Sequence, residues 1–501
     1  MRNEAGSVLL YYGGLPIDTI PDLYFYGVEE NDHFGTAASP AGDFNGDGYD
    51  DIILGRWDVA HACLYLGGEN MDTEPDLILH EQGSHIYFGE CASTAGDMNG
   101  DGFSDVIVAD CQNGFVKVYL GNNAIEKVSP FDYLTYHAKS YFRNCASSAG
   151  DFNGDGYADV IVGDYSDETY GYRGRVRIFF GSDTLDNKVD LVLTTGKEGD
   201  YFGEAVACAG DVNGDGYSDV MVGAPGFEDE EPGAEGRVYV YFGNPDGDTE
   251  PDVIITGTDE QPVGRYINSL GDLNNDGFDD IAVSIPFFGN IELPNNVYIY
   301  YGGKVMDNIE DAVISMVSIN FGADVASIGD INHDKYDDMI VGCSFYPLGA
   351  YIYYGGDIMH TTVDEILPGG WWSWYEDGVS CSSAGDVNND GFPDILIGWP
   401  SQNVDAQAAD HFFMEGRTEI RIYPNPLTLS TNIFYRLERP AFIEIAIIDI
   451  QGRVQAVLVK GYQSAGDHSI EWKADNFSPG VYFCTIRSEQ FNITRKMILV
   501  R

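Results

Sequence analysis

The sequence predicts an all-β protein, in which a seven-bladed β-propeller is followed by a small β-sandwich. Three observations predict this fold. An acidic nonapeptide occurs seven times, with successive copies starting 54 to 61 residues apart. The stretches between the copies have the alternating apolar patterns of short β-strands. The composition then changes near Gly416, where a segment of different charge begins.

The composition limits the partners that this chain can have. Its 501 residues include 81 Asp and Glu against 26 Lys and Arg, a formal charge of −55. This charge repels phosphate backbones, so we expect no nucleic acid partner. No apolar run is long enough to span a bilayer, so we expect no transmembrane segment. Residues 7–14 are too few and too rich in tyrosine for a signal-peptide core, so we expect none in this chain, and an incomplete N-terminus stays open.

The repeated nonapeptide carries acidic residues at fixed positions. Positions 1, 5 and 9 are Asp in every copy, position 3 is Asn, and position 7 is Tyr or Phe. Position 6 is Gly in six copies, which suits a sharp turn because Gly adopts positive φ at little cost. Lys335 takes that position in the sixth copy. The copies are residues 43–51, 97–105, 151–159, 211–219, 272–280, 330–338 and 386–394.

We predict that these nonapeptides are structural Ca²⁺ sites, because Ca²⁺ takes about six to eight hard oxygen ligands in flexible geometry. The alternative is a plain hairpin turn, for which Asn-Gly-Asp-Gly is common. A turn needs no acid at positions 1 and 9, however, and three packed carboxylates repel one another unless a cation intervenes. Occupation of the sixth loop stays open because Lys335 adds a positive charge. The predicted ligands are the side chains at positions 1, 3, 5 and 9 and the carbonyl at position 7: Asp43, Asn45, Asp47, Tyr49, Asp51, Asp97, Asn99, Asp101, Phe103, Asp105, Asp151, Asn153, Asp155, Tyr157, Asp159, Asp211, Asn213, Asp215, Tyr217, Asp219, Asp272, Asn274, Asp276, Phe278, Asp280, Asp330, Asn332, Asp334, Tyr336, Asp338, Asp386, Asn388, Asp390, Phe392 and Asp394.

Each repeat is predicted to be a four-stranded antiparallel sheet. A strand of small residues precedes each loop, and an apolar strand such as 219–225 follows it. An alternating strand such as 237–243 and a further strand such as 251–257 complete the sheet. The chain begins with the last two strand types, at 7–14 and 21–27, and its final repeat has only the first two. We therefore expect the N-terminal strands to complete the last sheet and close the ring. Truncation of a longer propeller is the alternative.

Short motifs flank the loops. In the fourth repeat Phe202-Gly203 precedes the loop and Gly223-Ala224-Pro225 follows it. With the loops, these motifs resemble the FG-GAP repeats of the integrin α-subunit propeller and its bacterial relatives. The resemblance implies a propeller domain over residues 1–416, with the loops on one face of the disc and partners on the opposite face. The other repeats keep the loop better than the flanking motifs, so the resemblance carries over the fold and no ligand.

The C-terminal segment differs from the repeats in charge. Residues 417–501 contain 11 Lys and Arg and 8 Asp and Glu, a net charge of +3, which leaves −58 for residues 1–416. Apolar and polar residues alternate at 443–450 and 480–486, with turn residues between these stretches. We predict that residues 417–501 form a small β-sandwich domain.

Several markers occur in this segment in a fixed order: Tyr423-Pro-Asn-Pro426, Asp449-Ile-Gln-Gly-Arg453, Gly466-Asp-His-Ser-Ile-Glu-Trp472, Pro479-Gly-Val-Tyr482 and Thr494-Arg-Lys496. They resemble the C-terminal sorting domain of the type IX secretion system. The resemblance implies a bacterial protein that is secreted or attached to the outer-membrane surface, with residues 417–501 recognised by the secretion and sorting machinery and usually cleaved. The alternative is an ordinary fibronectin-like adhesive sandwich.

Two functions of different classes stay open. The first is a Ca²⁺-stabilised adhesion or recognition module that binds an extracellular protein or glycan at the face opposite the calcium loops. Candidate contact loops are residues 165–172 and 370–375, whose aromatic rings suit sugar or protein surfaces. The second is an extracellular glycan-acting enzyme, a polysaccharide lyase or hydrolase, on the same scaffold. The sequence has no nucleophile elbow, zinc helix or phosphate-binding loop. We therefore favour the first function and assign no catalytic residue.

Overall fold

The computed structural model of the chain consists of strands joined by turns and loops. It describes all residues except 1–4, 15–16, 18, 29–32, 57–59, 81–86, 112–114, 126–129, 136–145, 166–172, 195–198, 228–234, 246, 248, 259–260, 287–293, 319, 344–348, 369–378, 401–418, 424–429, 438, 450–452, 465, 475–476, 489–491 and 500–501. Among the described residues there is no helix that could cross a bilayer. The chain divides into two compact units, Met1–Val404 and Asp405–Arg501. The predicted boundary at residue 416 lies outside the described residues.

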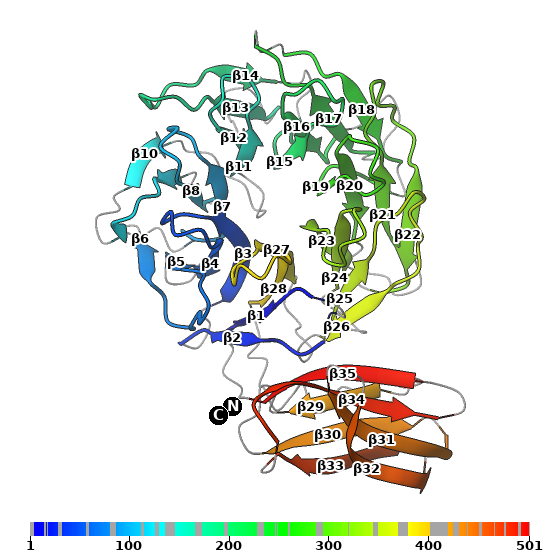
Figure 1. Ribbon diagram of the computed structural model, residues 1–501. Coiled ribbons are helices and arrows are strands. Elements are labelled where there is room, and N and C mark those ends of the chain that lie inside the picture. Colours follow the sequence, from blue (N-terminus) through cyan, green and yellow to red (C-terminus); the bar gives the residue numbers. More distant parts are fainter. Residues whose placement is uncertain are drawn as a thin grey trace. The chain divides into compact units, whose positions relative to one another are not determined.

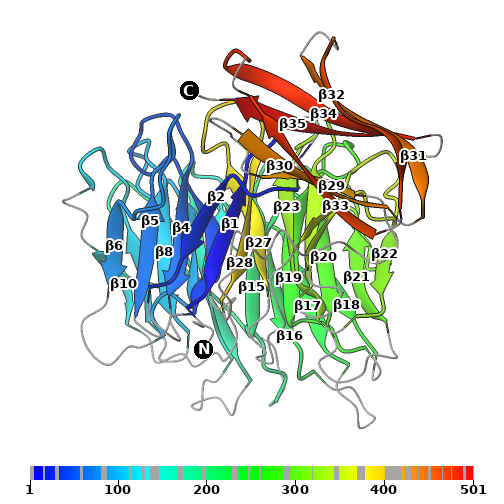
Figure 2. The same cartoon turned by 90° about the horizontal axis from the view of Figure 1, so that it is seen from below.

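The first unit contains seven four-stranded antiparallel sheets, and their innermost strands encircle a central axis (Figure 1). The strands run along this axis (Figure 2). The innermost strands are β3 (Phe34–Gly42), β7 (Cys91–Gly96), β11 (Ala146–Gly150), β15 (Ala205–Gly210), β19 (Tyr266–Gly271), β23 (Phe321–Gly329) and β27 (Ser380–Gly385). The second strands are β4 (Asp51–Arg56), β8 (Asp105–Asp110), β12 (Asp159–Asp164), β16 (Asp219–Ala224), β20 (Asp280–Ile285), β24 (Asp338–Cys343) and β28 (Asp394–Trp399).

The outer half of each sheet follows the same order. The third strands are β1 (Ser7–Tyr11), β5 (His61–Tyr65), β9 (Phe115–Tyr119), β13 (Arg175–Phe179), β17 (Arg237–Tyr241), β21 (Asn295–Tyr300) and β25 (Gly349–Tyr353). The outermost strands are β2 (Leu23–Tyr26), β6 (Leu77–His80), β10 (Pro130–Thr135), β14 (Leu191–Leu193), β18 (Val253–Thr256), β22 (Ala312–Met316) and β26 (Glu365–Pro368). The all-β propeller fold predicted from the sequence is confirmed.

The composition of each strand matches its distance from the axis. The innermost strands consist largely of Ala, Ser and Gly, as in β7, where the sheets converge and space is smallest. The second strands are apolar and buried on both faces, because a neighbouring sheet packs on each side. In the outermost strand β6, Leu77 and Leu79 pack in an apolar cluster, whereas Ile78 between them is 45% exposed, because only one face of the strand packs against a neighbouring sheet.

Both ends of the first unit build the seventh sheet. Strand β1 pairs antiparallel with β28, with Leu9 opposite Ile397, and β2 pairs with β1. The resulting order is β2-β1-β28-β27. Without β1, strand β28 would expose a row of unpaired backbone groups, so this pairing protects the apolar strand that ends the last repeat.

Apolar clusters hold neighbouring sheets together. The first unit has seven such clusters, and each contains buried side chains from two adjacent sheets, including one between the seventh sheet and the first. The residue at position 2 of every loop is fully buried in one of these clusters and anchors the loop. These anchors are Phe44, Met98, Phe152, Val212, Leu273, Ile331 and Val387.

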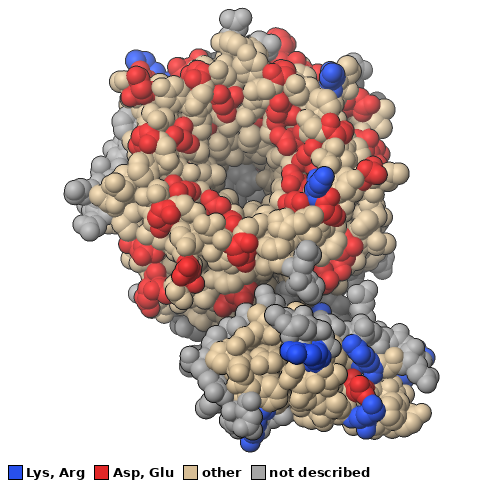
Figure 3. All heavy atoms as spheres, in the orientation of Figure 1, with Lys and Arg blue, Asp and Glu red and all other residues tan. Residues whose placement is uncertain are grey.

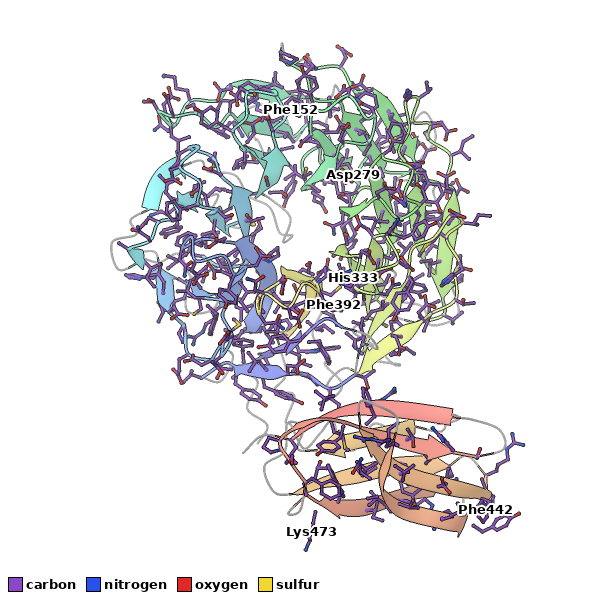
Figure 4. The ribbon with its side chains drawn as sticks, viewed as in Figure 1. Phe152, Asp279, His333, Phe392, Phe442 and Lys473 are labelled. Atoms are coloured by element: carbon purple, nitrogen blue, oxygen red, sulfur yellow. The ribbon has the colours of Figure 1, made fainter. Side chains whose placement is uncertain are left out.

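The second unit is a two-sheet sandwich, as the sequence predicts. One sheet has the order β29-β30-β33 and the other the order β32-β31-β34-β35. Its core includes Ile433, Ile445, Trp472 and Ile486, all almost fully buried. Phe442 lies outside this core, 47% exposed, and its ring meets Tyr462 edge-on (Figure 4). The strands are β29 (Glu419–Tyr423), β30 (Ser430–Leu437), β31 (Ala441–Asp449), β32 (Val454–Gln463), β33 (Gly466–Lys473), β34 (Gly480–Arg487) and β35 (Asn492–Leu499).

We expect Leu9→Ala to destabilise the first unit by about 2–5 kcal/mol, because the side chain is 1% exposed and packs between the sixth and seventh sheets. Val305, which is 90% exposed, provides the control, and Val305→Ala should change stability by less than about 0.5 kcal/mol. Urea unfolding measures both. Equal effects of the two substitutions would mean that the closing strand contributes no packing energy.

Candidate metal-binding loops

The seven nonapeptides connect the innermost strand of each sheet to the second strand. Loop 43–51, for example, joins β3 to β4. Because these two strands occupy the same places in every sheet, all seven loops lie at the same end of the first unit. All the predicted ligand residues are among the described residues. The loops therefore form a ring at one face of the propeller.

Within each loop, side chains at positions 1, 3 and 5 lie close together. In loop 43–51, Asp43 accepts hydrogen bonds from the backbone N–H groups at positions 4, 5 and 6, at 2.7, 3.0 and 2.9 Å. The amide oxygen of Asn45 accepts the same N–H of Asp47, at 2.9 Å. Asp47 in turn accepts the N–H of position 7 at 3.0 Å. Four of these bonds recur in all seven loops. The N–H groups of positions 5 and 6 donate to the side chain of position 1, the N–H of position 5 also donates to the side chain of position 3, and the N–H of position 7 donates to the side chain of position 5.

The Asp at position 9 has a different place, because it begins the second strand and faces the interior of the sheet. Asp219 is fully buried, and its two oxygens accept the N–H groups of Val212 at 2.9 Å and Gly243 at 2.8 Å. The carboxylate thus joins its own loop to the hairpin between the third and fourth strands. The same two contacts occur in every repeat.

Burial shifts the titration of these carboxyl groups. It raises the pKa of Asp51, Asp105, Asp159 and Asp219 to about 7, although the two backbone N–H groups act in the opposite direction. The pKa values of Asp280, Asp338 and Asp394 rise to about 8 for the same reason. The neighbouring carboxylate at position 5 contributes a smaller increase in each loop. A charge at position 9 is therefore costly when nothing compensates it.

The oxygens of each loop suit a hard cation by their chemistry. A carboxylate offers about four lone-pair sites. In the first loop, hydrogen bonds occupy three of these sites on Asp43, two on Asp47 and two on Asp51. Each carboxylate thus keeps room for a further contact. The described residues contain no group of three or more His, Cys, Asp or Glu side chains that could hold a metal ion as they stand. The structure therefore brings positions 1, 3 and 5 together and leaves position 9 bound to backbone.

The sixth loop keeps the shared conformation despite its different residues. Lys335 has a φ of 84°, and its N–H donates to Asp330 at 2.8 Å, as Gly does in the other loops. His333 at position 4 has a φ of 58°, and its ring lies against that of Phe392 in the next loop, with centroids 4.0 Å apart (Figure 4). A side chain in this left-handed region costs roughly 1 kcal/mol or more. At position 6 the sixth loop therefore carries backbone strain that glycine avoids in the other six loops, whereas at position 4 Asn275 and Asn389 also have positive φ.

The aromatic residue at position 7 links neighbouring loops. A Cβ atom at Gly46 would lie 2.4 Å from the ring of Phe103, and one at Gly100 would lie 2.6 Å from the ring of Tyr157. In each case the ring covers position 4 of the preceding loop. Glycine at position 4 thus leaves space for the ring that arrives from the next sheet.

Two further kinds of residue support the loops, a glycine in every repeat and an Asp in six repeats, and the sequence analysis missed both. A glycine after the third strand donates its N–H to the position-9 carboxylate, as Gly243 does to Asp219. An Asp before the fourth strand accepts the N–H next to that glycine, as Asp252 does from Phe242 at 2.8 Å. The available signal was the recurrence of this glycine at the same place in every repeat. The Asp residues that act in this way are Asp22, Asp76, Asp190, Asp252, Asp311 and Asp364.

The predicted contact loops are mostly beyond the described residues. Residues 166–172 and 370–375 lie outside them. Tyr165 is described, and it is only 8% exposed. Its ring meets that of Tyr201 edge-on, with centroids 5.7 Å apart. Tyr165 therefore packs within the propeller, whereas Tyr201 is 40% exposed.

Comparison with protein families agrees with both parts of the chain. Residues 34–56, 146–179, 202–241 and 264–305 match the FG-GAP repeat, and residues 97–162 match the FG-GAP-like repeat. Residues 421–500 match the secretion system C-terminal sorting domain. The chain carries FG-GAP repeats and a C-terminal sorting domain. Both resemblances identified from sequence motifs are confirmed, and together they indicate an exported propeller protein.

The chain matches less than a third of the length of the curated relatives below. Integrin alpha-4 of Xenopus laevis is 33% identical over 250 residues, which is 47% of this chain and 22% of that integrin. Integrin alpha-8 of Homo sapiens is 30% identical over 285 residues, or 53% and 24%. A solved structure of PorZ, a surface component of the type IX secretion system of Porphyromonas gingivalis, has 11% identity over 95% of this chain and 77% of that one. Its TM-score is 0.21, which supports no structural comparison.

We expect the metal-free protein to lose stability as the pH rises from about 4 to about 8. The position-9 carboxyl groups have folded-state pKa values of about 7 or 8 against an ordinary value of 3.8, so the folded state binds more protons than the unfolded state over this range. One pKa unit corresponds to about 1.4 kcal/mol, so even a small part of these shifts, summed over the seven groups, should cost several kcal/mol. Urea unfolding in EDTA at pH 5 and pH 8 measures the loss. A higher midpoint at pH 8 would contradict the assigned burial.

Proposed function

We propose that this protein is an exported, Ca²⁺-stabilised recognition module, in which the propeller binds an extracellular partner and the C-terminal unit directs secretion. One observation carries the calcium part. Seven loops repeat one arrangement of carboxylate and amide oxygens, and each carboxylate of the first loop keeps acceptor capacity beyond its hydrogen bonds. Ca²⁺ is favoured over Mg²⁺, which demands tighter octahedral geometry and keeps its waters.

In the proposed site, the residues of each loop would supply the ion with different oxygen ligands. Positions 1, 3 and 5 supply exposed oxygens that already lie close together. Position 7 supplies its carbonyl, and the buried Asp at position 9 supplies a negative charge. In the fourth repeat the oxygens of this residue, Asp219, accept the backbone N–H groups of Val212 and Gly243. A bound cation supplies positive charge, which offsets the repulsion among the three carboxylates. The ion is structural in this proposal and takes part in no reaction.

The face opposite the loops is the proposed recognition surface for an extracellular protein or glycan. Three arginines lie at strand ends on that side. Arg56 ends β4, and Arg175 and Arg237 begin β13 and β17. Arg265 lies there too, with a side chain that is 41% exposed and donates to Glu204 at 3.1 Å. Acidic side chains are spread widely over the propeller in Figure 3, with few Lys or Arg among them. The arginines thus give the opposite face hydrogen-bond donors for an extracellular partner.

The C-terminal unit is proposed to act as the address for export. Its match to a secretion system sorting domain supports recognition by the type IX machinery, with the propeller as the cargo. The unit has its own buried core, so its fold does not depend on side chains from the propeller. We propose that the protein is delivered to the outer-membrane surface or released outside the cell.

Calcium should raise the melting temperature of the protein by several degrees, because an ion that binds only the folded state stabilises it. Asp211→Ala removes the position-1 ligand of one loop among seven, so the difference between melting in calcium and in EDTA should shrink by roughly one seventh. Scanning calorimetry measures this difference. Asp183→Ala, at an exposed Asp outside the loops, is the matched control and should leave it unchanged. Identical melting of the wild type in calcium and in EDTA would remove the calcium proposal.

Deletion of residues 417–501 should leave the propeller folded but retained inside the cell. The expected folding follows from the separate cores of the two units, and the expected retention from the loss of the sorting domain. Circular dichroism of the purified propeller and immunoblots of cell and culture fractions measure the two outcomes. Normal delivery of the truncated protein would refute the sorting role.

A further inference from the structure

Neighbouring loops are joined at position 8. At six junctions the backbone N–H of position 8 donates to the carbonyl of position 1 in the preceding loop. Asp279, for example, donates to Asp211 at 3.1 Å, and Ser218 donates to Asp151 at 3.1 Å. The other four bonds are Ser104 to Asp43, Ala158 to Asp97, Asp337 to Asp272 and Asp50 to Asp386. The first residue of each of these six loops is therefore held by the next sheet.

A glycine before position 1 allows this close approach. A Cβ atom at Gly210 would lie 2.1 Å from Oδ2 of Asp279, and one at Gly150 would lie 2.2 Å from the hydroxyl oxygen of Ser218. Both glycines have positive φ, at 81° and 62°. The position-8 side chain thus occupies the space that a larger residue before the loop would fill.

Three junctions have an additional hydrogen bond. The carboxylate of Asp279 accepts the N–H of Asp211 at 2.7 Å. Asp337 accepts the N–H of Asp272 at 2.9 Å, and Asp50 accepts that of Asp386 at 2.8 Å. In these loops both backbone groups of the first residue, its N–H and its C=O, are bound by position 8 of the next loop.

The junction between the sixth and seventh loops differs. Position 8 of the seventh loop is Pro393, which has no N–H to donate. Its ring only packs near Gly329, where a Cβ atom would lie 3.1 Å from the proline Cγ. The carbonyl of Asp330 therefore has no bond of the kind that the other six loops receive.

We propose that the residue at position 8 positions the cation site of the preceding loop at six of the seven junctions. The effect is strongest for the loops that begin at Asp211, Asp272 and Asp386, where a carboxylate and a backbone N–H hold the first ligand residue from both sides. It is weaker for the loops that begin at Asp43, Asp97 and Asp151, which are held through the carbonyl alone, and it is absent for the loop that begins at Asp330. The inference rests on the proposed calcium function.

The physical basis is preorganisation. Bonds to both backbone groups fix the main chain at position 1, which carries the first ligand of the loop. A site whose ligands are held in place before binding loses less conformational freedom when the ion arrives. Calcium should accordingly fill the loops in the order set by their junctions, even though the ligand residues at positions 1, 3, 5 and 9 are the same.

Asp279 is the residue on which to test this. Asp279→Ala removes the carboxylate that accepts from Asp211, whereas Asp279→Asn keeps an oxygen that can accept. Ser218→Ala is the matched control, because Ser218 holds the preceding loop through its backbone N–H, which donates to the carbonyl of Asp151. Hydrogen exchange with mass spectrometry, repeated over a series of calcium chloride concentrations, gives a calcium midpoint for each loop and also reports loop amides in EDTA.

We expect Asp279→Ala to raise the calcium midpoint of loop 211–219 roughly fivefold, the effect of one lost hydrogen bond, and to speed exchange in that loop in EDTA. Asp279→Asn should restore most of the wild-type midpoint, and Ser218→Ala should leave that of loop 151–159 within about twofold. Pro393→Ala supplies the missing N–H and should lower the midpoint of loop 330–338. A change confined to loop 272–280, which contains Asp279, would overturn the inference.

The same experiment distinguishes failure of the calcium proposal from failure of the positioning role. If calcium protected no loop in the wild type, the calcium proposal would fall and the cation part of this inference with it. Unchanged exchange in loop 211–219 of Asp279→Ala in EDTA, together with normal calcium protection in the wild type, would instead overturn the positioning role while calcium binding stood.

Discussion

The structure depends on the supply of acceptors for backbone N–H groups at the loop face. A tight loop of nine residues leaves many N–H groups without a partner in the sheet, and buried N–H groups need one. Aspartate provides it: position 1 accepts N–H groups of its own loop, and position 9 accepts one from the loop and one from the next hairpin. The loop, the second strand and the hairpin are thereby fixed to one another in every repeat.

This requirement changes the meaning of the high acidic content. An Asp that accepts backbone N–H groups has a structural role, and each repeat uses such residues at positions 1, 5 and 9 and, in six repeats, before the fourth strand. Their charges are packed within a few residues and repel one another. The same residues that complete the hydrogen bonding thus create the negative site that a cation would relieve. The fold and the proposed ion binding thus rest on the same pattern of aspartates.

The sequence predicts the repeated elements well, because a repeat presents the same signals seven times. The nonapeptide located every turn between the first and second strands, and the placement of 7–14 and 21–27 predicted that β1 and β2 would join the last sheet. Contacts between residues far apart in the sequence were not predictable in this way. The inward orientation of Asp219 depends on Gly243, 24 residues later, and the role of Asp279 depends on Asp211, 68 residues earlier. The glycine recurs in every repeat, but strand periodicity does not show which side chain its N–H meets.

The junctions between loops suggest why position 8 tolerates so many residue types. The bond shared by six junctions comes from the backbone N–H of position 8, which Ser104, Ala158 and Asp337 all supply. Proline has no N–H and cannot supply it. The side chain then adds a second bond where it is Asp. The apolar cluster between the sixth and seventh sheets does not depend on this bond, so Pro393 leaves the ring closed. Its effect is therefore confined to the loop face, where the first residue of the sixth loop is the least restrained.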